Sequence, residues 1–446
     1  MHQVLEKMPT QSTSLLENLA ELHSKNHCYQ QAIHFYSLVL EKCQSSSQSD
    51  PSQIQRLFLC IIQQFLAEQN YFQALDYYLK ILQISPQNLS QISDDILKAC
   101  SNINDYKKQI YYLDQAVLFL SQNPDKEVYI EAIAKFSRQI GILYHLQNDK
   151  NSAIKCYERA IEVIKASQTA AIHFDLTEDY VRLGMVYLEK KAFDKALGCL
   201  QEALKILLII PKEENYQVIE KITEKIGSIY LIKEEYMNAL SQYRTCLETK
   251  MKRLGLCHKE LVPIVEIIGG IYMKQENFID ALRYYKQAYR MVIKTGNNED
   301  SRLMTIYINM GAIYKTNNKS QKALKYYSKA LKIVKAHKEL EKNKEEKLKL
   351  YREIGELFHK MDNYSESVKF LVKILKAENE ETSSKNLEVY VKVANLYEIL
   401  GKHQKAQHYL MKLFVLQKKL LGDYHLCTQA TLWRLEHMNQ ITKEIF

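Results

Sequence analysis

The segment from Tyr307 to Ala330, YINMGAIYKTNNKSQKALKYYSKA, decides the fold because its spacing recurs along the chain. Its defining positions are Tyr307, Met310, Gly311, Tyr314, Ala323, Tyr327 and Ala330. With Gly311 as a centre, equivalent segments are centred on Ala20, Ile62, Leu97, Gly141, Gly184, Gly227, Gly269, Gly355 and Ala394. Successive centres lie 35 to 44 residues apart, and self-similarity at such a period is the signature of a repeat architecture.

Each column of the repeat has a physical role. The residue before the centre is apolar in every unit, and the residue three positions after the centre is usually aromatic. Both therefore lie on one helical face. Twelve residues after the centre, nine of the ten units have a small residue: Ala32, Ala74, Ala153, Ala196, Ala239, Ala281, Ala323, Ser367 and Ala406. The third unit has Gln109 there and is therefore divergent. Small residues on facing helices predict a tight helix–turn–helix hairpin, with Asn, Asp or Gly at its turn.

The composition agrees with stacked helices. With 12 Gly and 6 Pro in 446 residues, the chain has few residues for turn-rich β folds. The 31 Tyr fall mainly in columns of the repeat, which indicates packing residues and not catalytic phenols. The net charge of +9 permits an acidic partner without requiring one.

No targeting or membrane segment is visible. The longest obvious apolar run, Ile206 to Ile210, is far below the roughly 18 residues needed to span a bilayer. The start of the chain lacks the apolar segment of a secretory signal. Nine Cys without a CxxC pair indicate reduced thiols. We therefore predict a cytoplasmic protein without membrane insertion.

No constellation of catalytic or metal-binding residues emerges. The sequence has no Gly-rich phosphate loop and no HExxH motif. Cys257-His258 and the pair His403 and His408 lack further ligands at a recognisable spacing. We predict no catalytic, cofactor-binding or metal-binding residue, no cofactor and no enzymatic activity.

Tyr pairs and Lys-rich segments are the remaining features that suggest nucleic acid. In Tyr284-Tyr285 and Tyr326-Tyr327 the second Tyr stands in a core column, so packing explains these pairs better than base stacking. The Lys-rich segment 338–349 also contains Glu, as a solvated loop does. We predict no nucleic-acid partner.

These columns resemble the tetratricopeptide repeat, in which a Leu-Gly pair, a Tyr and two Ala recur. The long period resembles the repeats of the kinesin light chain, whose Leu-Gly-x-x-His motif is matched by Leu254 to His258 and by Leu421 to His425. The resemblance implies an all-α, right-handed superhelical solenoid of about ten hairpins and a C-terminal capping helix. We predict an N-terminal tail (1–13), units 1 to 3 (14–125), units 4 to 10 (126–420) and the cap (421–446).

The resemblance also implies a concave groove formed by first helices, with groove residues at fixed offsets from each unit centre. Those offsets give the candidate partner-groove residues Arg138, Met185, Leu188, Leu231, Met273, Lys274, Ile308, Lys315, Arg352, His359, Lys360 and Asn395. Apolar anchors beside cations suit an acidic-hydrophobic or amphipathic segment of a partner protein. The alternative is that these residues are ordinary exposed positions on a scaffold whose contacts lie elsewhere.

Three functional classes follow. The first is a non-catalytic adaptor that binds a peptide or helix in its groove and helps assemble a multiprotein complex. The second is a structural component of a cytoskeletal or ciliary/axonemal assembly of the dynein or intraflagellar-transport type, bound through its convex face and termini. The third, an enzyme or enzyme subunit, has no visible site. The sequence leaves open the partner, the pathway, the oligomeric state and whether the divergent third unit breaks the superhelix.

Overall fold

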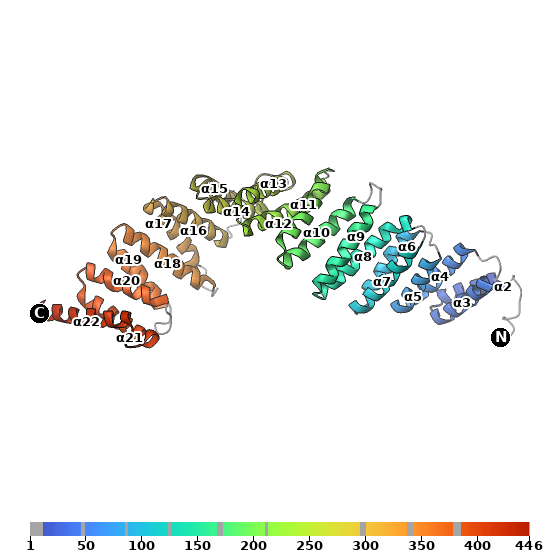
Figure 1. Cartoon of the computed structure of the whole chain (residues 1–446), viewed down its shortest axis with the longest axis horizontal. Coiled ribbons are helices and arrows are strands. Elements are labelled where there is room, and N and C mark those ends of the chain that lie inside the picture. Colours follow the sequence, from blue (N-terminus) through green and yellow to red (C-terminus); the bar gives the residue numbers. More distant parts are fainter. Residues whose placement is uncertain are drawn as a thin grey trace. The chain divides into compact units, whose positions relative to one another are not determined.

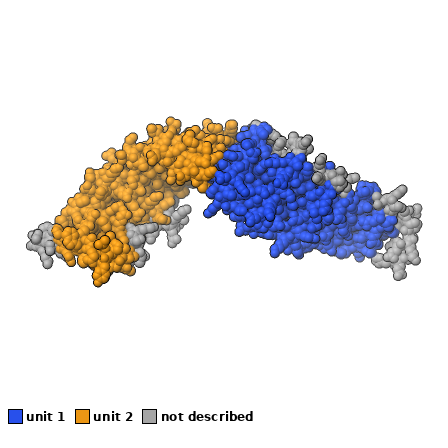
Figure 2. Space-filling model, viewed as in Figure 1, with its two compact units in different colours: residues 1–229 blue, residues 230–446 orange. Residues whose placement is uncertain are grey.

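The structure of the protein is a computed structural model that describes residues 12–45, 50–84, 88–123, 126–166, 173–209, 213–294, 300–336, 342–377 and 385–445. In these ranges the chain forms helices and no strands (Figure 1). It divides into two compact units, residues 1–229 and 230–446 (Figure 2). The predicted all-α solenoid of consecutive hairpins is confirmed in each unit. The predicted division near residue 125 stays a prediction.

The first unit consists of antiparallel helix pairs in chain order. Its helices are α2 (Ser12–Lys25), α3 (Tyr29–Ser45), α4 (Pro51–Ala67), α5 (Tyr71–Gln83), α6 (Leu89–Ser101), α7 (Tyr106–Gln122), the 3₁₀ helix η1 (Lys126–Tyr129), α8 (Ile130–Leu146), α9 (Lys150–Ala166), α10 (His173–Glu189), α11 (Phe193–Ile209) and η3 (Glu213–Asn215). Helix α12 (Tyr216–Ile232) contains the boundary between the units.

The second unit continues the same pattern. Its helices are α13 (Tyr236–Leu254), η4 (Lys259–Leu261), α14 (Val262–Lys274), α15 (Phe278–Lys294), α16 (Asp300–Thr316), α17 (Ser320–Ala336), α18 (Lys342–Lys360), α19 (Tyr364–Ala377), α20 (Lys385–Ile399), α21 (His403–Leu421) and α22 (Leu426–Ile445). Helices α14, α16, α18 and α20 are the first helices of their hairpins. Helix α22 follows the last hairpin and lies within residues 421–446, the range predicted for the capping helix.

The small residues of the repeat form the closest helix–helix contacts. The nine small residues at the predicted contact column are all fully buried, Ser367 included. The centres Gly141, Gly269 and Gly311 face tyrosine rings of the second helix of the same hairpin. Because these centres lack a side chain, a large aromatic ring fits between the two helices.

Every regular hairpin turns through one residue in the left-handed region. Seven residues after the centre, φ is positive at His27, Gln69, Asn148, Lys191, Glu234, Glu276, Asn318, Asp362 and Gly401. In this geometry the next backbone N–H reaches back to the first helix, as Asn277 N does to Tyr272 O at 2.9 Å. The predicted turns are therefore confirmed at a common position of the repeat.

Glu276 is a costly residue for such a turn. Its φ of 58° brings Cβ close to the backbone, a strain that glycine avoids. We expect Glu276→Gly to raise the free energy of unfolding by about 1 kcal/mol, measured by urea denaturation. The matched control is Glu248→Gly, which replaces an exposed glutamate inside helix α13 and should lower stability by about 0.5–1 kcal/mol. A loss of stability in Glu276→Gly would contradict the proposed strain.

The divergent third hairpin, α6 and α7, uses a different turn. Residue 104, its seventh after the centre, does not have a positive φ. Gln109, at the position of the usual alanine, is buried and donates a hydrogen bond from Nε2 to the carbonyl of Ile103 at 2.5 Å. The bulky column residue is thus accommodated by a side-chain contact to the turn.

The tyrosine pairs of the second helices have two packing roles. In the pairs Tyr284-Tyr285 and Tyr326-Tyr327, the first ring stacks on an aromatic residue of the first helix, with centroids 5.5 Å apart for Tyr272 and Tyr284 and 5.3 Å for Tyr314 and Tyr326. The second ring, such as Tyr285, is buried against the central glycine. Packing within the hairpin therefore accounts for these pairs.

Candidate functional site

The first helices of the second unit form a continuous row, which we call the first-helix surface (α14, α16, α18, α20 and α22). Figure 1 shows α16, α18 and α20 following one another along the unit. Side-chain contacts join neighbours of the row directly, from Lys315 to Glu353, from Glu356 to Lys392 and from Glu398 to Arg434. The surface is therefore held together by polar contacts between consecutive hairpins.

Lys315 of α16 forms ion pairs with two carboxylates of the next first helix. Its Nζ lies 2.7 Å from Glu353 and 2.9 Å from Glu356, both on α18. These two carboxylates raise the pKa of Lys315 against the opposing effect of burial. The network also neutralises much of the positive charge that the sequence suggested for this part of the groove.

The other predicted cations have fewer partners. Lys360 is exposed and donates a hydrogen bond to Asn318 Oδ1 at 2.6 Å. Lys274 is exposed at the end of α14, and Arg352 is half-buried on α18. These three side chains therefore carry most of the positive charge that a partner could meet among the predicted residues.

The predicted apolar residues lie partly in the core. Leu231 and Met273 pack against the core of the hairpins around α14, and Ile308 packs against the core of the following hairpins. Met185 and Leu188, in the first unit, are also half-buried. Each therefore has part of its side chain in the core and part exposed.

Arg138, the remaining predicted residue of the first unit, lies in a buried ion pair. Its Nε lies 2.5 Å from Asp179 Oδ1, and its Nη2 lies 3.0 Å from Asp179 Oδ2. Asp175 and Glu178 lie 3.4 and 3.8 Å from the same guanidinium. The side chain of Arg138 therefore joins α8 to α10.

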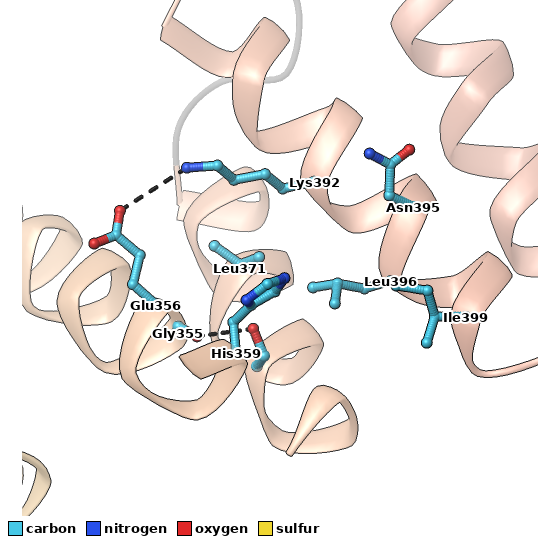
Figure 3. A pocket seen from close by; sticks show the side chains of 9 residues that line it. Gly355, Glu356, His359, Leu371, Lys392, Asn395, Leu396 and Ile399 are labelled. Carbon is cyan, nitrogen blue, oxygen red and sulfur yellow. Dashed lines mark hydrogen bonds and ion pairs between the residues drawn. The ribbon is translucent and has the colours of Figure 1, made fainter. Parts of the chain in front are cut away.

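His359 and Asn395 are brought together at a pocket between α18, α19 and α20 (Figure 3). The pocket has a volume of about 300 Å³, and its lining residues are Gly355, Glu356, His359, Ser367, Leu371, Lys392, Asn395, Leu396 and Ile399. Its floor is apolar, whereas Lys392, Asn395, Glu356 and His359 contribute polar groups. This is the concave, mostly apolar type of site with few polar groups that proteins use for recognition.

Helix α22 borders this site through Arg434. The Arg434 guanidinium donates hydrogen bonds to Asn395 Oδ1 at 2.7 Å and to Glu398 Oε1 at 2.9 Å. Trp433, the single tryptophan of the chain, immediately precedes Arg434 on α22 and is 66% exposed. Tryptophan and arginine are the residues most often found at energetically dominant positions of interfaces. Sequence reasoning missed Lys392, Leu371 and Arg434, although Leu371 faces the central Gly355 of its own hairpin and the other two contact the preceding hairpin.

Family models identify the repeat. Models described as tetratricopeptide repeat match residues 264–336, and also 139–166 and 387–419. The chain is a tetratricopeptide-repeat protein. Repeat arrays of this family are protein-interaction scaffolds and typically non-catalytic. A search of the curated proteins found no match.

Solved structures are similar to this tetratricopeptide-repeat protein over parts of its length. BtubC (BKLC) from P. vanneervenii is 21% identical, covering 53% of this chain and 94% of its own, with a TM-score of 0.39. A signal transduction ATPase with a tetratricopeptide-repeat sensor from Pyrococcus horikoshii is 17% identical, covering 89% and 56%, with a TM-score of 0.47. A putative kinesin light chain from Podospora anserina is 14% identical, covering 46% and 96%, with a TM-score of 0.38.

The histidines of the two Leu-Gly-x-x-His motifs contribute to local structure. His258 Nδ1 accepts a hydrogen bond from Glu260 N at 3.3 Å, and His425 Nδ1 accepts one from Cys427 N at 3.2 Å. Each histidine thereby satisfies a free N–H at the start of the following helix. Among the residues that the structure describes, no cluster of three His, Cys, Asp or Glu is arranged to hold a metal ion.

Three cysteines of the second and first helices, Cys100, Cys156 and Cys199, are protonated at neutral pH. Burial raises the pKa of Cys156 and of Cys199 to about 11 and that of Cys100 to about 12. A thiol with such a pKa is a poor nucleophile, because the thiolate is the reactive form.

No helix within the described ranges is long and apolar enough to cross a membrane.

Glu266 is the most perturbed carboxyl of the first-helix surface. It lies on α14, three residues before the centre Gly269, and its Oε1 is buried without a hydrogen-bond partner among the described residues. Burial raises the pKa of Glu266 to about 7, and nearby Arg302 only partly opposes this effect. The ionised form is therefore costly in the folded protein.

This cost makes stability depend on pH. Since the pKa of Glu266 is higher folded than unfolded, its contribution to stability is fully present below about pH 4 and is lost as the pH rises to about 7. Glu266→Gln removes the charge at every pH. We expect urea unfolding to show the variant more stable than wild type by about 2 kcal/mol at pH 8 and nearly equal to it at pH 4. An equal difference at both pH values would contradict this assignment.

Proposed function

We propose that this protein is a non-catalytic scaffold that binds a segment of a partner protein along its first-helix surface and helps assemble a multiprotein complex. The observation that carries the proposal is the pocket lined by His359, Lys392 and Asn395 on that surface. Around it, the ion pairs of Lys315 and Arg434 fix the side chains in place before a partner arrives. Such preorganisation lowers the entropic cost of binding.

The charges around the pocket favour a segment with both apolar and acidic residues. Ile399 lines the pocket and is 60% exposed, so it offers an apolar contact. Arg352 and Lys360 lie on α18, the helix that lines one side of the pocket. An amphipathic or acidic-hydrophobic peptide would place its apolar side chains in the pocket and its carboxylates near these cations.

Site-specific photocrosslinking tests which surface binds. A photoreactive amino acid replaces Ile399 on α20 in one variant and Val415 on α21 in the other, two positions with 60% and 59% exposure. We expect a partner protein from native extract to crosslink at position 399 and not at 415, with the crosslinked segment identified by mass spectrometry. Crosslinks at 415 alone would contradict the proposal and support a structural component bound through its second helices.

A charge-reversal pair checks the same proposal with purified components. Arg352→Glu with Lys360→Glu should weaken binding of the identified segment at least ~10-fold, because both changes place repulsive charge beside it. Lys325→Glu with Lys332→Glu, on the second helix α17, is the matched control and should leave binding unchanged. Lys315 is unsuitable for this test because its reversal would place a third carboxylate beside Glu353 and Glu356.

A further inference from the structure

The pocket between α18, α19 and α20 lies where a leucine faces the central glycine, at a column that holds tyrosine in most units of the repeat. In the hairpins whose centre is a glycine, the second helix has a large residue, Tyr or Leu, sixteen residues after that centre. A Cβ added to Gly141 would lie 2.8 Å from Tyr157, and one added to Gly311 would lie 2.7 Å from Tyr327. In the hairpin of α18 and α19 the corresponding residue is Leu371.

Leu371 is smaller than the tyrosine that faces the central glycine in the hairpins of Gly141, Gly269 and Gly311. A Cβ added to Gly355 would lie 3.3 Å from Leu371 Cδ2, at a longer distance than in the tyrosine hairpins. Gly184 also faces a leucine, Leu200, but that leucine lies closer, at 2.9 Å from the added Cβ. The combination of a glycine, a leucine and this wider spacing leaves the cavity of about 300 Å³.

In the tyrosine hairpins, the tyrosine hydroxyl contacts a polar side chain of the following first helix. Tyr157 reaches Arg182 of the following first helix, and the two side chains form a hydrogen bond. Tyr327 lies 3.5 Å from Glu353 of its following first helix. Both partners stand two residues before their unit centre, the position that Lys392 occupies before Ala394.

Lys392 is positioned to donate a hydrogen bond to the hydroxyl of an aromatic ring in the pocket. It lines the cavity, and its side chain is 43% exposed. Its Nζ lies 2.7 Å from Glu388 and 3.9 Å from Glu356, so the ammonium group has hydrogen-bonding capacity beyond these contacts. Figure 3 shows Lys392 directed toward Glu356, with the His359 ring beside Leu371 and Leu396.

We propose that this pocket binds the phenol ring of a tyrosine side chain presented by the partner segment. The ring occupies the space between Gly355, Leu371 and Leu396, and Lys392 donates a hydrogen bond to the phenol oxygen. The partner thus supplies the ring that this hairpin lacks. The inference rests on the proposed function for the source of the tyrosine, whereas the pocket's preference for a phenol can be tested without a partner.

The first experiment measures binding of p-cresol, the tyrosine side chain alone, by NMR of the full chain with labelled Leu and Ile methyl groups. We expect saturable shifts of Leu371, Leu396 and Ile399, and weaker binding of toluene. Leu371→Tyr restores the tyrosine of the repeat and should abolish both. Lys376→Tyr, which adds a tyrosine at an exposed position of the same helix, is the control and should bind p-cresol as wild type does.

A second variant tests the phenol preference of the pocket without changing a core residue. Lys392→Met removes the donor at a partly exposed position and should weaken p-cresol roughly three- to tenfold while leaving toluene unchanged. Absence of methyl shifts with p-cresol, or equal binding by wild type and Leu371→Tyr, overturns the proposal. An unchanged preference for p-cresol over toluene in Lys392→Met overturns the role of Lys392.

A displayed library of 12-residue peptides connects the pocket to a partner segment. We expect selected peptides to share a tyrosine at one position and to lose binding to Leu371→Tyr, with retained binding to Lys376→Tyr. If p-cresol binds but selected peptides contact other surfaces, the pocket chemistry stands and the proposed function of the first-helix surface fails. If selected peptides bind this surface without an aromatic residue, the proposed function stands and the phenol specificity is wrong.

Discussion

Replacing Arg138 by methionine is expected to destabilise the first unit by about 3–5 kcal/mol, because it leaves the carboxylate of Asp179 buried and uncompensated. Asp179 is fully buried, and the Arg138 side chain is only 10% exposed. The two parallel hydrogen bonds between them are the geometry that makes an arginine–carboxylate pair strong. Urea unfolding followed by circular dichroism measures the effect.

The loss should depend on pH in a defined direction. Burial raises the pKa of Asp179 to about 6, and Arg138 opposes this rise. Without Arg138 the pKa of Asp179 rises further. At pH 5 the buried Asp179 is then neutral, and burying it costs little. At pH 8 ionising the buried carboxyl has a large free-energy cost, which lowers the stability of the folded state. We therefore expect Arg138→Met to lose more stability at pH 8 than at pH 5. A loss independent of pH would show that packing and not charge is responsible.

The double variant Arg138→Met with Asp179→Leu shows whether the loss of stability comes from the unpaired charge of Asp179. Replacing both charges by apolar side chains leaves no buried ion, and stability should return to within ~1 kcal/mol of wild type. Hydrogen exchange of the α8 and α10 amides would locate the effect, since a solenoid need not unfold in one step. If the double variant is less stable than Arg138→Met, the interpretation of the pair is wrong.

The hairpins could be predicted from the sequence because each depends on local columns. Gly311, Ala323 and Tyr327 are close in sequence and repeat at the same spacing, so a single alignment of units predicts their contacts. The left-handed turn residue follows from the same register, even where the residue is Glu276. In such folds most contacts are within a hairpin or with its neighbour, which is why the period alone is so informative.

The surface contacts could not be predicted in this way. The groove offset that selected Arg352, three residues before the centre, also selected Arg138, yet Arg138 is buried in an ion pair with Asp179, 41 residues further along the chain. An offset places a residue on a helix face but does not say which charge stands on the next helix. The pocket, in contrast, had a partial signal, because Leu371 stands opposite a glycine in a column that is tyrosine in most units, although Leu200 shares this feature.

Introducing a side chain at Gly311 is expected to be nearly as damaging as breaking the buried pair. A Cβ at this position would lie 2.7 Å from Cε1 and 2.8 Å from Cδ1 of Tyr327, closer than carbon atoms pack. Tyr327 is only 2% exposed, so its ring has little room to move. We expect Gly311→Val to lower the free energy of unfolding of the second unit by about 3 kcal/mol, measured by urea denaturation.

Gly198 supplies the matched control. It lies on the exposed side of α11, and no atom lies within 4 Å of an added Cβ. Gly198→Val should change stability by less than ~0.5 kcal/mol, because valine and glycine differ little in helix propensity. Tyr327→Leu in the Gly311→Val background should recover part of the loss, since it removes the ring that the valine meets. Equal effects of valine at both glycines would mean that helix propensity, and not the contact with Tyr327, selects glycine at the centre of the repeat.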